Sequence, residues 1–310
     1  MNIFDRAARL SRLITEAHDM LDRAIREQIT EHRDGRGRSR QHAATVILFS
    51  GGNDSTVLAH LMRHRATHAA HANTGIGIEQ TREFVRRTCA DWGLPLLERH
   101  PPAGSRYEDL ITETDPETGE VQGFPGPARH WKMYQRLKLR AIEQVQAELI
   151  NNPWRQRIVL LAGRRLTESP RRTQRDIPEI ERRKSAVWVS PLRNWTALDL
   201  NTYRFMNRDC PRNEVSDLIH MSGECLCGAF AKPGELDEIG DWFPDVASHI
   251  RGLEQTVRAA GAPEERCRWG WGAYRDRKTA ERPPKSGAMC SSCEQRWTAV
   301  PLWGAEAVVA

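Results

Sequence analysis

The sequence predicts an α/β protein built on a doubly wound, parallel, five-stranded sheet and followed by a smaller cysteine-rich, metal-binding region. Three observations support this prediction. Short apolar segments alternate with helical ones between residues 45 and 207, as in parallel sheets with right-handed crossovers. The first apolar segment runs straight into a glycine turn, a common form of anion-binding loop. Beyond Cys210 the alternation stops and paired cysteines appear.

Composition limits the class of protein. A chain of 310 residues with 39% hydrophobic and 28% charged residues can form one large domain and a smaller one. No apolar run approaches the roughly 20 residues that span a bilayer, and the N-terminus has no apolar signal core. We therefore expect a cytoplasmic protein without a membrane partner. The net charge of +5 suits anionic substrates but does not by itself indicate nucleic acid.

The first 40 residues are predicted to form a helix and a linker. Apolar residues recur at helical spacing over 3–32, and a basic, glycine-rich stretch follows at 33–40. We expect the helix to pack on the domain, with a contact in a homo-oligomer as the alternative. The expected division is 1–40, then a nucleotide-binding domain at 41–207, then a cysteine-rich domain at 208–310.

The glycine turn follows the first predicted strand, residues 45–49. Gly51 and Gly52 let an anion approach the backbone, and the helix that begins after them leaves its first N–H groups without partners. Ser50 and Ser55 add hydroxyls, and Asp54 can hold Mg²⁺ or cap the helix. The alternative is an ordinary turn before a capped helix, but the flanking strand, helix and hydroxyls favour phosphate binding.

The next segments complete the alternating pattern. We predict strands over 67–74, 94–97, 157–163 and 186–190, and helices over 78–92, 131–150 and 197–207. Residues 100–127, rich in proline and glycine, are predicted as a loop that is either an active-site lid or a surface excursion. Because ligands sit at the carboxyl ends of parallel strands, the loops after these strands should share one rim.

The fourth predicted strand ends in an arginine-rich loop. Arg164 and Arg165 follow Gly163, and Arg171 and Arg172 come soon after. Guanidinium groups bind phosphate with bidentate geometry. The position of this loop favours an anion clamp over a solvated basic loop.

Three motifs together resemble a known family. Ser-Gly-Gly-x-Asp-Ser at Ser50–Ser55 resembles the pyrophosphate-binding loop (PP-loop) of the ATP pyrophosphatase, or adenine nucleotide alpha hydrolase-like, superfamily. Gly-x-Arg-x-x-Glu-Ser-x-Arg at Gly163–Arg171 and Pro-Leu-x-x-Trp-Thr at Pro191–Thr196 are similar to its phosphoadenosine-phosphosulfate (PAPS) reductase-like branch. The resemblance covers about residues 40–207. It implies a doubly wound sheet with an adenine nucleotide at its rim and phosphates in the glycine loop.

The cysteine-rich end is predicted to bind a metal. Cys225 and Cys227 form a C-x-C pair, and Cys290 and Cys293 form a C-x₂-C pair. Four thiolates can hold Zn²⁺ in a closed tetrahedral site or an iron–sulfur cluster such as [4Fe–4S]. The alternative is buried free thiols. Cys210 and Cys267 are spare candidates whose roles stay open.

Three functions are compatible with these motifs. The first is an ATP pyrophosphatase that uses Mg²⁺ and adenylates an acceptor on the way to sulfur transfer. The resemblance to thiolation enzymes with cysteine-bound clusters implies DNA or tRNA as that acceptor. The second is a PAPS or adenylyl-sulfate reductase, although the nearest string to that family's Glu-Cys-Gly motif, Glu224–Gly228, lies far from the C-terminus. The third is a nucleic-acid-binding module without turnover.

The residues expected to act fall into two groups. Catalysis is assigned to an acid that places Mg²⁺ and two arginines that neutralise developing charge. These are Asp54, Arg165 and Arg171. The residues expected to bind ATP or PAPS are Ser50, Gly51, Gly52, Asn53, Asp54, Ser55, Asn73, Thr74, Gly75, Gly163 and Arg165.

Overall fold

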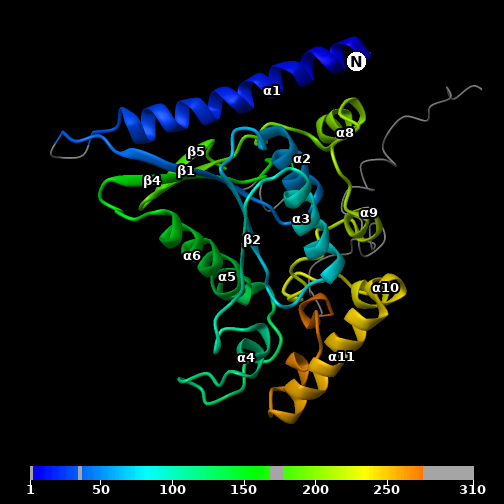
Figure 1. Cartoon of the computed structure of the whole chain (residues 1–310). Coiled ribbons are helices and arrows are strands. Elements are labelled where there is room, and N and C mark those ends of the chain that lie inside the picture. The colour runs from blue at the N-terminus through cyan, green and yellow to red at the C-terminus, as the bar shows by residue number, and fades with distance from the viewer. Residues whose placement is uncertain (1–2, 34–36, 168–176, 275–310) are drawn as a thin grey trace, which may run out of the picture.

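A six-stranded sheet forms the centre of the computed structural model, which describes residues 3–33, 37–167 and 177–274 (Figure 1). The strand order is β3-β2-β1-β4-β6-β5, and the pairs from β3 to β6 are parallel. The strands are β1 (Gln41–Leu48), β2 (His68–Ala72), β3 (Leu96–Arg99), β4 (Gln156–Leu161), β5 (Ile180–Arg183) and β6 (Ala186–Val189).

The prediction of five strands is correct for the parallel part of the sheet and misses one edge strand. β5 pairs antiparallel with β6 across a tight turn at Lys184, whose φ is +53°. Its sequence, Ile-Glu-Arg-Arg, has a single apolar residue, so no strand pattern is visible. A short charged strand is a common way to end a sheet without exposing an aggregation-prone edge.

The order of the strands reverses between β1 and β4. After β1 the chain adds β2 and β3 on one side, and then crosses to β4 on the other side of β1. The loops that follow β1 and β4 therefore diverge at their carboxyl ends. In doubly wound sheets this switch point is where ligands bind.

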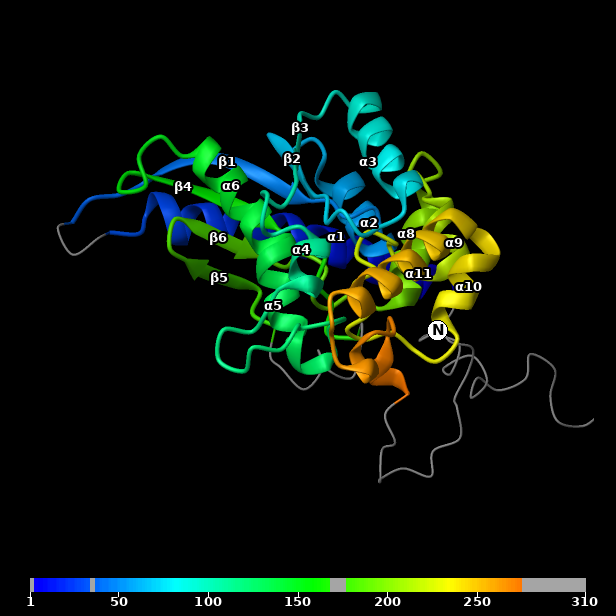
Figure 2. The ribbon, with the colours of Figure 1, turned by 90° about the horizontal axis from the view of Figure 1, so that it is seen from below.

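Helices cover both faces of the sheet (Figures 1 and 2). Alternate strand residues lie in different hydrophobic clusters: Ile47 packs with α1, α2, α3 and α8, while Val46 packs with α6. Burial on both faces explains the continuous apolar strands. The helices are α1 (Ile3–Ile25), α2 (Asn53–Met62), α3 (Glu79–Asp91), α4 (Tyr107–Thr112), α5 (His130–Tyr134), α6 (Arg140–Leu149), α8 (Ala197–Met206), α9 (Glu214–Ile219), α10 (Glu235–Trp242) and α11 (Pro244–Ala259).

The region after residue 207 contains more helix than the sequence pattern indicated. It contains α9, α10 and α11, and α11 buries Ile250, Leu253 and Val257 at helical spacing. These residues share one hydrophobic cluster with Tyr107 and Met133 from the 100–137 segment. The segment at 100–127, predicted as a loop that is either an active-site lid or a surface excursion, contains α4 and packs against α11. No helix within the described ranges has the length and apolar character to cross a membrane.

The N-terminal helix is predicted over 3–32, and it is present as α1 followed by a π-helical turn at Arg26–Thr30. It is fixed to the domain by Arg9, whose Nε and Nη2 donate to the two carboxylate oxygens of Asp199 at 2.9 Å each. Asp199 also closes a capping box with Thr196 at the start of α8. One carboxylate therefore caps one helix and anchors another.

We predict that Asp199→Asn lowers the free energy of unfolding by about 1.5–3 kcal/mol at pH 7, because it removes a charge-assisted hydrogen-bond pair. Burial opposes ionisation, but the hydrogen bonds from Arg9 and Thr196 hold the pKa of Asp199 below its ordinary value. Its contribution is complete above the unfolded pKa of about 3.9 and is lost as the pH falls through the lower folded value.

Urea unfolding at pH 7 and at low pH tests this prediction, with the exposed Asp91→Asn as the control. The difference between wild type and Asp199→Asn should shrink as the pH falls below 4. A difference that is the same at both pH values would contradict the assignment.

Candidate functional site

The glycine loop joins the end of β1 to the start of α2. Gly51 has a φ of +76°, and a Cβ at this position would lie 2.7 Å from Cγ2 of Thr81. Gly52 is extended and is the N-cap of α2, and a Cβ there would lie 3.1 Å from Cβ of Ser222. Only glycine suits position 51, because a side chain there would be strained at this positive φ and would clash with Thr81.

The loop presents a set of backbone donors. In the described structure, no N–H group from Ser50 to Ser55 donates a hydrogen bond, and the first such bond runs from Thr56 N to Gly52 O at 2.9 Å. Ser55 Oγ donates to Gly52 O at 3.0 Å and lies 3.1 Å from Ser50 Oγ. Six N–H groups at the N-terminus of a ten-residue helix are suited to bind an anion.

The loop after β4 forms the second wall. A Cβ on Gly163 would lie 3.2 Å from the backbone of Asp54 and Ser55, so the end of β4 packs directly on the first turn of α2. Arg165 is buried, and its Nε donates to Asp54 Oδ2 at 2.8 Å. The structure thus brings together the acid and the arginine that were predicted as catalytic. It pairs them with each other.

A cation that the sequence did not reveal reaches the loop from α8. Arg204 Nη1 donates to Asn53 Oδ1 at 2.7 Å. Arg204 Nη2 is buried and has no hydrogen-bond partner in the described structure. A buried guanidinium N–H without a partner is costly, so this nitrogen is available as a donor next to the loop.

The three residues predicted at the end of β2 hold the rim together. Asn73 donates through Nδ2 to Glu98 Oε1 at 2.7 Å and accepts from Gly75 N at 3.1 Å. Thr74 N donates to Glu224 Oε1 at 2.8 Å. These side chains therefore shape the wall of the site through contacts within the protein.

Glu224 is the most buried charged group at this rim, with 1% of its surface exposed. Besides the bond from Thr74, its carboxylate lies 3.1 Å from His71 Nε2 and accepts from Arg82 Nε at 3.4 Å. His71 Nδ1 lies 2.7 Å from Phe49 O. The carboxylate thus connects β2, α3 and the C-x-C segment in one polar network.

Residues that follow α8 hold the glycine loop in place through hydrogen bonds to its backbone. Asn213 Nδ2 donates to Gly51 O at 2.9 Å and to Thr81 Oγ1 at 3.1 Å, and Ser216 Oγ also donates to Gly51 O. Thr81 Oγ1 donates to Ser222 O at 2.7 Å. Sequence reasoning missed these contacts. From the sequence, Asn213 can be recognised only as the N-cap of a helix, and this gives no indication of its contact with the glycine loop.

The C-x-C pair lies beside this network. Cys227 is buried and Cys225 half-buried, and their segment is held by bonds from the Tyr107 hydroxyl to Cys227 O at 2.9 Å and from Trp269 Nε1 to Leu226 O at 2.7 Å. A hydrogen bond from Cys227, with the positive charge of Lys138, holds the pKa of Cys225 below its ordinary value.

The predicted metal site stays a prediction. Within the described residues, no three His, Cys, Asp or Glu side chains are grouped as metal ligands. Cys290 and Cys293 lie outside that part of the chain, as does Arg171 of the predicted anion clamp. Burial raises the pKa of Cys210 to about 11 and raises that of Cys267 as well, which favours the thiol over the thiolate that metals bind.

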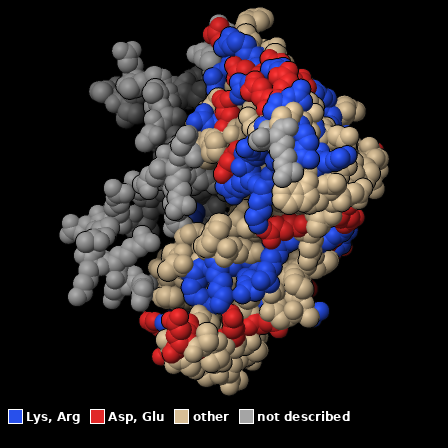
Figure 3. Space-filling model, turned by 90° about the vertical axis from the view of Figure 1, so that its left-hand side faces the viewer, with Lys and Arg blue, Asp and Glu red and all other residues tan. Residues whose placement is uncertain are grey.

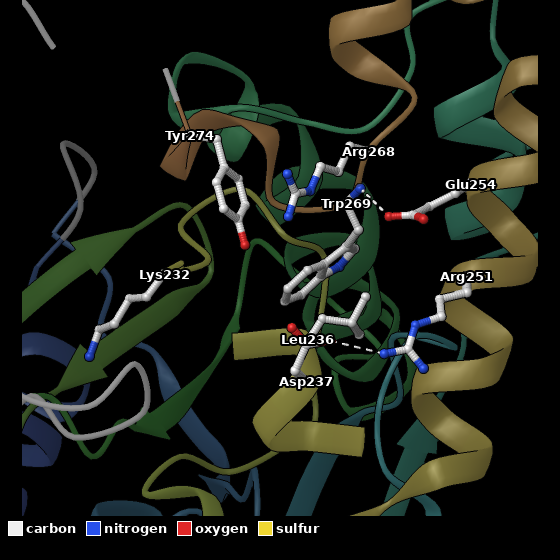
Figure 4. Close-up of a pocket in the computed structure, with 8 residues that line it drawn as sticks. All are labelled: Lys232, Leu236, Asp237, Arg251, Glu254, Arg268, Trp269 and Tyr274. Carbon is white, nitrogen blue, oxygen red and sulfur yellow. Dashed lines mark hydrogen bonds and ion pairs between the residues drawn. The ribbon is translucent and has the colours of Figure 1, made fainter. Parts of the chain in front are cut away.

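Two hollows lie away from the glycine loop, next to α10 and α11. The first, of about 130 Å³, is drawn in Figure 4, where Arg251 pairs with Asp237 and the backbone of Trp269 donates to Glu254. The second, of about 570 Å³, shares Glu254 and other residues with it. Neither is lined by a residue predicted to act.

Comparison with known proteins was made at the level of families and of structures. The family model for the phosphoadenosine phosphosulfate reductase domain matches residues 44–217. A search of curated proteins found no match.

Three solved structures are among those that match this chain. PAPS reductase from Candida auris, in a phosphate complex, is 19% identical over 56% of this chain and 77% of its own, with a TM-score of 0.38. FMN adenylyltransferase from Candida glabrata, with FAD and inorganic pyrophosphate, is 13% identical over 70% and 64%, with a TM-score of 0.44. The U34-tRNA thiolase from Methanococcus maripaludis, with its [4Fe–4S] cluster, is 15% identical over 80% of both chains, with a TM-score of 0.39.

We predict that Gly51→Ala destabilises the protein by about 1–2 kcal/mol more than Gly93→Ala, as measured by urea unfolding. Both glycines have positive φ, so both variants have the same backbone strain. Only Gly51 would also place its Cβ against Thr81, whereas nothing lies within 4 Å of a Cβ at Gly93. Equal losses for the two variants would show that the loop can move away from α3.

We also predict that Glu224→Ala lowers the free energy of unfolding by about 3–5 kcal/mol, the usual cost of removing one partner from a buried ionic network. The loss leaves Thr74 N and Arg82 Nε without their acceptor. Glu117→Ala, at an exposed position, is the control. A loss below 1 kcal/mol in the same urea measurement would mean that Glu224 does not fix this rim.

Proposed function

The chain belongs to the phosphoadenosine phosphosulfate reductase domain family, and on that premise we propose that it is an enzyme that binds ATP at the glycine loop, releases pyrophosphate and adenylates an acceptor. The observation that supports this most directly is the set of backbone N–H groups from Ser50 to Ser55 without acceptors in the described structure. Phosphate oxygens would accept from these groups, and from Arg204 Nη2, which is buried without a partner there.

Asp54 and Arg165 are the residues proposed to act on the phosphates. Asp54 Oδ2 accepts from Arg165, and no described residue hydrogen-bonds its other carboxylate oxygen. A carboxylate oxygen at the start of an anion-binding helix fits Mg²⁺, which prefers oxygen ligands and phosphates. Bound there, Mg²⁺ would supply charge neutralisation. Arg165 would contact the leaving pyrophosphate, and Arg171 is the second cation proposed from the sequence.

Sulfur chemistry is proposed at the cysteines. Glu224 fixes the C-x-C segment to the end of β2, so Cys225 stands at the same edge of the sheet as the glycine loop. Cys225 and Cys227 offer two adjacent sulfurs, which suits Zn²⁺ or an iron–sulfur cluster completed by Cys290 and Cys293. A bound cluster would supply sulfur-transfer chemistry, and the proposed acceptor is a nucleic acid, DNA or tRNA.

Reduction of PAPS is the second candidate, and one specific observation favours it. Cys225 is half-buried, directly follows the anchored Glu224, and lies at the rim where a nucleotide would sit. In that reaction a thiol reductant is oxidised to a disulfide and PAPS releases sulfite. Sulfite release from PAPS with a thiol reductant would establish this activity in place of the first.

We predict that the purified protein releases pyrophosphate from ATP in the presence of Mg²⁺ and a nucleic acid acceptor. Asp54→Ala should lower kcat/KM by about 100-fold, the size of effect seen when one charge-stabilising group is removed. The exposed Asp91→Ala is the control for charge and fold. Pyrophosphate release can be followed with a coupled phosphate assay.

Two outcomes would count against the proposal. If ATP does not bind, the glycine loop is not a nucleotide site. If ATP and a polynucleotide both bind without turnover, the chain is a binding module. The colour of the protein separates the metals, because an iron–sulfur centre is brown and zinc is colourless.

A further inference from the structure

One stretch of the chain carries basic side chains without acidic ones. From residue 121 to residue 142 the chain contains five Lys and Arg residues and no Asp or Glu. Arg129 is used inside the fold through bonds to Gln122 O and Gly123 O, and Lys132 pairs with Glu113. In the described structure Arg136 makes no hydrogen bond or ion pair. Positive charge is therefore left over on this stretch.

The same stretch displays aromatic rings. Trp131 is 57% exposed, and its ring stacks on Tyr134 with centroids 5.4 Å apart and planes 24° from parallel. Next to it His130 packs on Phe230 at 4.5 Å, and Phe230 is itself 41% exposed. Stacked rings on a basic surface offer flat faces to another π-system.

The stretch runs along the C-x-C segment. Its inner side chains Met133 and Leu137 share a hydrophobic cluster with Leu226 and Cys227. Lys138, one turn after Tyr134, lies close enough to Cys225 for their charges to interact. The helix therefore leads from an exposed tryptophan to the edge of the proposed active site.

Figure 3 views the side of the molecule on which α5 and α6 lie in Figure 1. Lys and Arg side chains gather in two areas near the middle of this face, and acidic side chains lie between these areas as well as towards its upper and lower ends. A polyanion would therefore be attracted to separate basic areas on this face.

We propose that the surface formed by Trp131, Tyr134 and Arg136 binds a single-stranded stretch of nucleic acid, with an unpaired base on the rings and a phosphate on the guanidinium. The proposal rests on the proposed function for its place in the reaction, because it names where the acceptor binds. A single strand is favoured over a duplex, since a base can stack on a side chain only when it is out of the helical stack.

The test is fluorescence anisotropy without ATP, using labelled oligouridylate and oligothymidylate of about 12 nucleotides, within the site sizes known for single-strand binders. Wild-type protein should bind, and Trp131→Ala should weaken the tighter complex about tenfold. Trp242→Ala, a tryptophan with the same 57% exposure on α10, is the matched control and should bind as wild type does.

A second variant tests the charge independently. Arg136→Gln should reduce the slope of log affinity against log salt by about one, whereas the exposed Arg87→Gln on α3 should leave the slope unchanged. The surface assignment is overturned if neither strand binds, if a duplex of the same length binds as tightly, or if Trp131→Ala and Arg136→Gln bind like wild type.

Different results would contradict the proposed surface and the proposed function. Strand binding with no pyrophosphate release from ATP would overturn the proposed function and leave the surface intact. Pyrophosphate release with no strand binding would overturn the surface alone and direct the search to an acceptor that is not a polynucleotide.

Discussion

The buried carboxylate of Glu224 is the interaction on which the geometry of the site depends. A negative charge with 1% exposure is tolerated only where several donors surround it. Here the partners come from two places: the end of β2 through Thr74 and His71, and α3 through Arg82, while the carboxylate itself belongs to the C-x-C segment. The charge therefore forces sheet, helix and cysteine segment into one fixed arrangement.

The shape of the glycine loop depends on that arrangement. Gly51 O accepts from Asn213 and Ser216, and Thr81 on α3 both blocks a side chain at Gly51 and donates to Ser222 O. The contacts to Gly51 O hold the loop on the rest of the protein. The N–H groups of residues 50–55 have no acceptor in the described structure, and a loop held in this way is pre-organised for an anion.

The sequence predicted those parts of the fold that have a periodic or local signal. The central strands β1, β4 and β6 contain apolar runs because both faces of the sheet are covered there, and the glycines and serines of Ser50–Ser55 indicate a turn. β5 was missed because Ile-Glu-Arg-Arg shows no alternation of apolar and polar residues, and because this strand forms by pairing with the neighbouring β6. The site residues that were missed, Arg204, Asn213 and Glu224, act on partners more than 130 residues away. No local pattern contains such information.

The pairing of Asp54 with Arg165 changes how an anion would enter the site. In the described structure the two charges neutralise each other, so the mouth of the loop is close to electrically neutral on this side. A triphosphate arriving alone would have to displace a carboxylate from its arginine. A triphosphate arriving with its cation offers each member of the pair a new counterion at once, oxygen for the guanidinium and metal for the carboxylate. If the loop binds ATP as proposed, this ion pair would favour a metal-bound nucleotide over bare phosphate.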